Sequence, residues 1–146
     1  MGRMGRPNLK VSAVIVAALA LGIQFIGPSP TNPALDPVRE LKTIEAFDRA
    51  CSDCHSSRTR WPWYSHVAPV SWLVVGHVDH ARRHMNVSEW AGIPPREADH
   101  KLATMCKFSR NGEMPLGSYL LMHRDAKLSE ADVDSICQWT EALRRP

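Results

Sequence analysis

Beyond its first ten residues, the chain has no surplus of basic residues. Arg3, Arg6 and Lys10 precede the first acidic residue, Asp36, and the remaining 15 of the 18 Lys and Arg equal the 15 Asp and Glu. A protein that binds nucleic acid needs basic side chains clustered on its folded surface, because contacts to the phosphates dominate affinity. The charge balance therefore argues against a nucleic-acid partner.

The chain also lacks extended strand-like alternation, internal repeats and low-complexity tracts outside one short Pro-rich stretch. Apolar residues recur instead at helical spacing, in segments separated by proline and glycine. We expect helices over about residues 36–54, 69–85, 94–111 and 130–145, and therefore an all-α fold. Ser129 is the predicted N-cap of the last helix, and Trp72, Leu73, Gly76 and Ala81 are expected to face inward on the second.

Cysteine is scarce, but two of the four cysteines stand in the motif Cys51-Ser52-Asp53-Cys54-His55. Cys-x-x-Cys-His is the attachment sequence for c-type haem. Each thiol can form a thioether to a porphyrin vinyl group, and the adjacent imidazole then becomes an axial ligand of the iron. The motif therefore predicts one haem, covalently attached through Cys51 and Cys54, with His55 as an iron ligand.

Two other interpretations of this motif are a redox dithiol and half of a zinc site. A thioredoxin-like dithiol needs a βαβ context, which this sequence does not show. A structural zinc site needs a second ligand pair at short spacing, and Cys106 and Cys137 stand too far apart to form one. Covalent haem remains the favoured interpretation.

Residues 11–26 form a run without charge. As a helix this run would be about 24 Å long, slightly short of a hydrocarbon core of ~30 Å. The basic residues before it favour a cytoplasmic N-terminus, which would place the following domain on the periplasmic side of a bacterial cytoplasmic membrane. We expect residues 1–27 to be a single-pass anchor, with a cleaved signal peptide as the alternative. Residues 28–35 then form a Pro-rich linker, and residues 36–146 form the exported domain.

Three stretches of the chain resemble the bacterial haem-binding domain family of small, membrane-anchored or exported c-type cytochromes. They are CSDCHSSRTRWPWYSHVAPVSWLV, HMNVSEW and NGEMPLGSYLLMHRDAKLSEADVDSICQW. The likeness extends over about residues 41–143, and its RWPWYS and GEMP segments are more specific than the haem motif alone. It implies a mostly helical monohaem domain. We therefore expect an all-α, cytochrome c-like domain around one covalent haem. The apolar run of residues 11–26 adds the expectation of a single N-terminal transmembrane helix before it.

The second axial ligand decides what such a haem can do, and Met114 is the favoured candidate. It stands in Gly112-Glu113-Met114-Pro115, a loop that can bring a thioether to the iron, and the resemblance implies a haem-facing methionine here. The alternative is a methionine that only packs against the porphyrin. The remaining candidates are Met85, Met105, Met122, His66, His77, His80, His84, His100 and His123.

Among these candidates, His77, His80 and His84 share one helix face because of their i, i+3, i+7 spacing. We expect this face to be solvated or to lie at the haem edge, and a metal bound jointly by His80 and His84 is the alternative. The face supplies the first replacement ligand if Met114 is not coordinated.

Aromatic and basic residues follow the haem motif closely. Trp61, Trp63 and Tyr64 are expected to pack on the porphyrin, with ordinary core or loop packing as the alternative. Arg58 and Arg60 are candidates to offset the charge of the haem propionates.

Cys106 and Cys137 fall on the inward stripes of the last two long helices. In an oxidising compartment a disulfide between them is the simplest explanation. Two buried free thiols are the alternative.

The leading functional hypothesis is a membrane-anchored electron carrier, not an enzyme, that moves single electrons between redox protein partners. A haem with both axial positions filled leaves no site for a substrate. The alternative is a ligand-binding haem protein, either a gas sensor or a small peroxidase, with an open sixth position. A third interpretation is a permanent subunit of a respiratory or photosynthetic complex.

Overall fold

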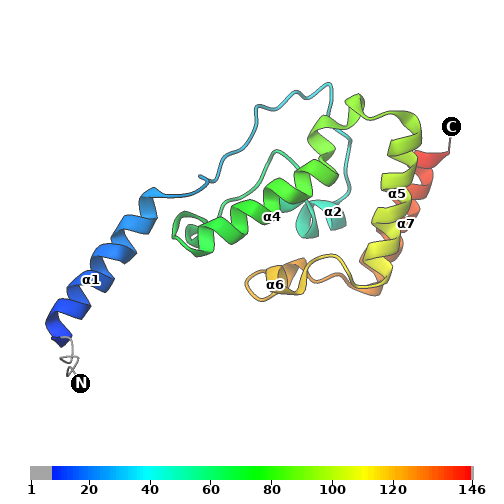
Figure 1. The fold of residues 1–146 in the computed structure, drawn as a ribbon. Coiled ribbons are helices and arrows are strands. Elements are labelled where there is room, and N and C mark those ends of the chain that lie inside the picture. The colour runs from blue at the N-terminus through cyan, green and yellow to red at the C-terminus, as the bar shows by residue number, and fades with distance from the viewer. Residues whose placement is uncertain (1–7, 146) are drawn as a thin grey trace, which may run out of the picture. The chain divides into compact units, whose positions relative to one another are not determined.

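The fold is all-α: residues 8–145, which the computed structural model describes, contain helices joined by irregular segments and no strand (Figure 1). The α-helices are α1 Leu9–Gly22, α2 Glu45–Ala50, α3 Ser52–His55, α4 Val70–His84, α5 Pro95–Arg110, α6 Gly117–Leu120 and α7 Glu130–Arg144. Short 3-10 helices cover Ile23–Phe25, Trp63–His66, Val87–Gly92 and Arg124–Ala126.

The described part of the chain divides into two compact units. The predicted division into residues 1–27, 28–35 and 36–146 stays a prediction. The first unit contains the described residues up to Thr31 together with Trp61–Gly76, and the second contains Asn32–Arg60 and the described residues from His77 onward. Helix α4 contributes its first turns to the first unit and its later turns to the second. The haem motif and Met114 therefore belong to the same unit.

The second unit is built around the pair α5 and α7, which lie side by side (Figure 1). A disulfide between Cys106 and Cys137 joins the two helices, as predicted. Phe47 of α2 and Ile136 of α7 are fully buried where α2 packs on this pair. The same core contains Ala46, Val87, Leu102 and Met105. This packing fixes the helix that leads directly into the haem motif.

Three of the four helices predicted for the domain are confirmed. Helices α4, α5 and α7 begin and end within two residues of the expected positions. The Ser129 hydroxyl accepts a hydrogen bond from the amide of Asp132, whose carboxylate in turn accepts from the Ser129 amide. This capping box accounts for the sharp start of α7.

The helix predicted from Asp36 is wrong in its first half. The amide of Leu41 donates to the Val87 carbonyl at 2.8 Å, and the amide of Ala91 donates to the Arg39 carbonyl at 3.0 Å. Backbone groups that pair with a distant segment are not available for i to i−4 bonding. Residues 40–44 are therefore extended or irregular, and helix α2 starts at Glu45.

The first unit joins the N-terminal segment to the loop before α4. The Gln24 side chain donates to the Ala68 carbonyl at 3.3 Å and accepts from the Ala68 amide at 3.0 Å. The indole of Trp72 donates to the Ile26 carbonyl at 2.7 Å. Gly27, with φ +118°, lies so close to this indole that a Cβ would come within 2.3 Å of Nε1.

These contacts correct the inward face predicted for α4. Trp72, Leu73 and Gly76 are exposed, whereas Ser71, Val75 and Val78 are buried. Trp72 turns away from that buried row because its indole is bonded to the N-terminal segment.

No helix within residues 8–145 combines the length and the apolar character needed to cross a membrane. Helix α1 has 14 residues, about 21 Å at the usual rise per residue, and gives way to a 3-10 turn after Gly22. The predicted single transmembrane helix is therefore not supported. Arg3 and Arg6, on which the predicted orientation depends, lie outside the described residues.

Candidate cofactor site

The haem motif lies in two short helical turns that continue from the buried end of α2. The Cys51 amide donates to the Phe47 carbonyl at 2.8 Å, and the His55 amide donates to the Cys51 carbonyl at 2.9 Å. Residues four apart in a helical turn lie on one face. Cys51 and His55 are accordingly presented to the same side of the motif.

That side opens into a cavity of about 400 Å³ with mainly apolar walls, a volume typical of small-molecule and cofactor sites. Cys51, His55 and Met114 all line it, although Met114 is 59 residues after His55 in the sequence. Further walls come from Phe47, from Met105 and Phe108 of α5, and from Leu116. The cavity thus brings the His55 imidazole and the Met114 thioether close to Cys51. An apolar cavity with these side chains fits a porphyrin with two axial ligands.

The His55 ring is oriented by the protein backbone. Its Nδ1 lies 3.1 Å from the Met85 carbonyl oxygen. Burial lowers the pKa of His55, and the Met85 hydrogen bond opposes that shift without reversing it. A neutral imidazole whose Nδ1–H donates to a carbonyl keeps the lone pair on Nε2 for a metal. Met85, a candidate ligand by sequence, thus contacts His55 through its backbone.

The two motif cysteines are free thiols in the structure. Burial, with a smaller contribution from the neighbouring Cys54, raises the pKa of Cys51 to about 12. Burial, followed by the charge of Asp53, raises the pKa of Cys54 to about 11. Redox dithiols have a lowered thiol pKa instead. This electrostatic environment is therefore unlike that of a thioredoxin-type motif.

Met114 reaches the cavity from a loop that folds back on the end of α5. The amides of Glu113 and Met114 both donate to the Phe108 carbonyl, at 3.0 and 3.2 Å. Gly112 has φ +69°, a left-handed conformation that glycine adopts without a Cβ penalty. The turn directs Met114, which is partly buried, into the same cavity as His55.

The histidine row predicted on α4 also lines this cavity. His77, His80 and His84 are joined there by His100 of α5, and the rings of His80 and His84 are 4.5 Å apart. Of the other candidate ligands, Met105 is buried in the cavity wall and Met122 is exposed. His123 stacks on Tyr119, and His66 belongs to the first unit.

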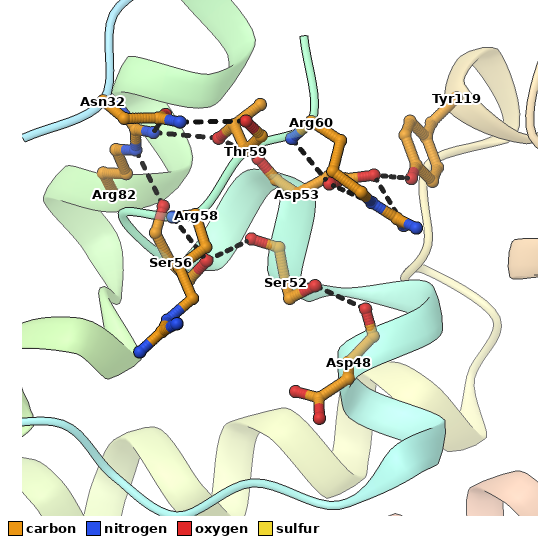
Figure 2. Close-up of polar contacts among 10 residues, drawn as sticks. All are labelled: Asn32, Asp48, Ser52, Asp53, Ser56, Arg58, Thr59, Arg60, Arg82 and Tyr119. Carbon is orange, nitrogen blue, oxygen red and sulfur yellow. Dashed lines mark hydrogen bonds and ion pairs between the residues drawn. The ribbon is translucent and has the colours of Figure 1, made fainter.

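Asp53, between the two motif cysteines, is the centre of a polar network that the sequence analysis missed (Figure 2). Its Oδ1 accepts from the amide and Nε of Arg60, both at 3.1 Å. Its Oδ2 accepts from Nη2 of Arg60 at 3.1 Å and from the Tyr119 hydroxyl at 2.9 Å. Burial raises the pKa of Asp53, but these bonds from Arg60 and Tyr119 outweigh it and hold the pKa below the usual range.

The two arginines predicted to face propionates have protein carboxylates as partners in the structure. Arg60 bonds to Asp53, and Arg58 donates to both oxygens of Glu40, at 2.9 and 2.6 Å. A propionate role for either arginine stays a prediction. The position of Asp53 inside the haem motif could have predicted this network. A carboxylate that is buried there needs a cation or hydrogen-bond donors as partners.

The segment that follows His55 is held by Arg82 of α4 (Figure 2). Its guanidinium donates to the Ser56 carbonyl at 2.9 Å, to the Thr59 hydroxyl at 2.8 Å and to the Asn32 side chain at 2.7 Å. Burial lowers the pKa of Arg82, and its guanidinium stays charged, as arginine side chains do in proteins. Arg82 therefore connects α4, which carries the histidine row, to the chain beyond the motif.

Trp61, Trp63 and Tyr64 lie in the first unit, and their predicted packing on the porphyrin stays a prediction. Trp63 is 74% exposed, and its ring meets that of Tyr64 edge-on at 5.8 Å between centroids.

Within the described part of the chain, no group of three or more His, Cys, Asp or Glu is arranged to hold a metal ion. A haem iron needs no such group, because the porphyrin supplies the equatorial ligands and the protein only the axial ones.

The family model described as a haem-binding domain matches residues 18–142. This range includes the Cys-x-x-Cys-His motif, Met114 and all the residues that line the cavity. No curated protein and no solved structure matches the chain.

Proposed function

The chain belongs to the haem-binding domain family, and from this premise we propose that it is a monohaem c-type cytochrome that carries single electrons between redox proteins. The observation that carries the proposal is the cavity that Cys51, His55 and Met114 line together. A cofactor with both axial positions filled by the protein exchanges electrons without binding a substrate. On this proposal the protein is a carrier and not an enzyme.

Each residue has a distinct part in the proposed site. Cys51 and Cys54 hold the porphyrin through thioethers, and His55 presents Nε2 while its Nδ1–H donates to Met85. Met114 supplies a thioether as the second ligand. When bound, the haem supplies a one-electron couple at its iron, and methionine–histidine ligation raises the potential of that couple. The apolar wall around both ligands keeps water away, which also tunes the potential.

The proposed location is the periplasmic side of a bacterial cytoplasmic membrane. The Cys106–Cys137 disulfide supports it, because disulfides persist in oxidising compartments. The exposed apolar side chains of α1, Val14 and Leu21 among them, support attachment to the membrane through the N-terminal segment. Fractionation of cells that express the full chain tests this: a haem protein in the cytosol would contradict the proposal.

Optical spectroscopy of the full-length holoprotein tests the ligand assignment. We expect a low-spin ferric spectrum with the weak long-wavelength band of methionine–iron ligation, and we expect Met114→Ala to abolish this band. Mass spectrometry after denaturation should find haem still bound, and no longer bound in the Cys51→Ala, Cys54→Ala double variant. A high-spin five-coordinate wild type would contradict the electron-carrier proposal.

A second candidate function is a haem protein that binds a small external ligand, such as a gas sensor or small peroxidase. The observation in its favour is the row His77, His80 and His84 in the cavity wall, where distal histidines could contact a ligand. Fast, stoichiometric CO binding to the reduced wild type would favour this function. Slow or substoichiometric binding would favour the electron carrier.

The electron carrier itself could be a free shuttle or a permanent subunit of a respiratory or photosynthetic complex. The exposed Trp63 favours a partner surface, because large exposed aromatic side chains are enriched at protein interfaces. If the protein is purified from native membranes in detergent and no partner protein remains bound to it, the free shuttle is favoured.

A further inference from the structure

We propose that Tyr119 and Asp53 form a positioning clamp that holds the Met114 loop against the haem motif and thereby keeps the second axial ligand in place. This inference rests on the proposed function, since it concerns how Met114 reaches the iron. The clamp is the 2.9 Å hydrogen bond from the Tyr119 hydroxyl to Asp53 Oδ2 (Figure 2). It joins two segments that are 66 residues apart in the sequence.

The Asp53 end of the clamp is rigid. The side chain is buried in the turn that carries both motif cysteines and is two residues from His55. Arg60 donates to both carboxylate oxygens through its amide and guanidinium. The carboxylate therefore has a fixed position relative to the first axial ligand.

The Tyr119 end of the clamp is close to the second axial ligand. Tyr119 lies in α6, five residues after Met114, and its amide donates to the Leu116 carbonyl at 3.0 Å. Its ring is stacked on His123 with 4.0 Å between centroids and planes 11° apart. The hydroxyl therefore extends from a fixed ring, so its bond to Asp53 restrains the loop and not only its own side chain.

On its other side the loop is held by backbone bonds and by one side-chain bond, from Asn111 Nδ2 to Glu113 Oε1 at 3.2 Å. The amides of Glu113 and Met114 donate to the Phe108 carbonyl at the end of α5, while Glu113 and Leu116 have exposed side chains. With the clamp formed, the segment that bears Met114 is anchored at α5 before it and at the haem motif after it. Without the clamp, only the α5 anchor remains within this set of contacts.

Loss of the clamp should increase the fraction of molecules in which Met114 has left the iron. A hydrogen bond to a charged acceptor has a strength that corresponds to roughly a tenfold change in such an equilibrium. An external ligand that competes with Met114 binds only the open form, so its apparent affinity follows the open fraction. Imidazole binding to the ferric protein therefore reads out the clamp directly.

The test uses full-length ferric holoprotein titrated with imidazole and followed by its optical spectrum. Tyr119→Phe removes the hydroxyl and keeps the ring stacked on His123, and we expect imidazole to bind roughly tenfold more tightly. The matched control is Ser118→Ala, an exposed neighbour on the same helix, which should bind imidazole as the wild type does. Asp53→Asn should raise the affinity for imidazole less than Tyr119→Phe does. In a protein that already carries Asp53→Asn, adding Tyr119→Phe should change the affinity less than it does in the wild type.

The outcomes separate this inference from the proposed function. The clamp is overturned if the Tyr119→Phe protein keeps both the methionine–iron band and the wild-type affinity for imidazole. This holds even if urea unfolds the variant more easily than the wild type. The electron-carrier proposal is unaffected by that result. A wild type without the methionine–iron band, or with a band that survives Met114→Ala, overturns the Met114 ligand assignment and the clamp with it, and a high-spin five-coordinate wild type overturns the electron carrier as well. If Tyr119→Phe yields no holoprotein, the Asp53→Asn protein decides, because wild-type imidazole affinity in it would overturn the clamp.

Discussion

The two sides of the cavity are constructed differently. On the His55 side, the proposed ligand follows a helix whose Phe47 is fully buried, and Met85 and Arg82 hold the ring and the chain after it. On the Met114 side, the proposed ligand stands in a loop held by backbone bonds to Phe108 and by Tyr119. The difference indicates that the folded core fixes His55, whereas the position of Met114 depends on a few local contacts.

The largest predicted effect is on the core under the His55 side. Phe47→Ala removes a fully buried side chain from the contact between α2 and the α5–α7 pair. We expect the free energy of unfolding to fall by about 3–5 kcal/mol, as for other large-to-small core substitutions. Chemical denaturation of the holoprotein measures this. Leu121→Ala, at a 76% exposed position, is the control and should cost little; a similar loss in both variants would contradict the assigned core.

The next effect concerns the disulfide that joins α5 to α7. Its cysteines are 31 residues apart, and the chain-entropy estimate for such a loop is roughly 3–4 kcal/mol. We expect the Cys106→Ser, Cys137→Ser double variant to lose about that much stability, with the methionine–iron band retained in the folded protein. Denaturation with and without reductant provides the check, since reductant should affect the wild type and not the variant. Loss of the band in folded variant protein would show that the Met114 side depends on this bond.

A smaller effect is expected from Arg82, which contacts the chain after His55. Arg82→Met keeps an apolar stem on α4 and removes the bonds to Ser56, Thr59 and Asn32. The buried Ser56 carbonyl and Thr59 hydroxyl then lose their donor, at a cost of about 1–3 kcal/mol. Imidazole affinity should change less than in Tyr119→Phe, because Arg82 supports the His55 side. If Arg82→Met changed imidazole binding more than the free energy of unfolding, the proposed difference between the His55 side and the Met114 side would be wrong.

The smallest effect is a pH dependence at the start of α7. Bonds from the Ser129 amide and hydroxyl and from Arg49 lower the pKa of Asp132 to about 2. A carboxyl whose pKa is lower in the folded state stabilises the fold above its unfolded pKa, near 3.8, and loses that contribution as the pH falls toward 2. The free energy of unfolding should therefore decrease across this window, and less steeply in Asp132→Asn. Equal slopes for the two proteins would contradict the capping-box assignment.

Local patterns in the sequence predicted the parts of the fold that local interactions determine. Ser129 bonds within its own helix, so α7 could be placed from the sequence, and the Cys51–His55 spacing is itself the haem signature. Residues 39–41 could not be placed because their backbone bonds go to residues 87–91. The Asp53–Tyr119 bond was missed for the same reason: nothing near either residue shows that a chain separation of 66 closes in space.

Near-infrared magnetic circular dichroism of the ferric full-length protein most directly tests the claim that His55 and Met114 are the two axial ligands. Its charge-transfer band differs in position between histidine–methionine and bis-histidine haem. We predict the histidine–methionine band in the wild type and its loss in Met114→Ala. A bis-histidine band in the wild type would contradict the account and would assign the second position to one of the other cavity histidines, His77, His80, His84 or His100.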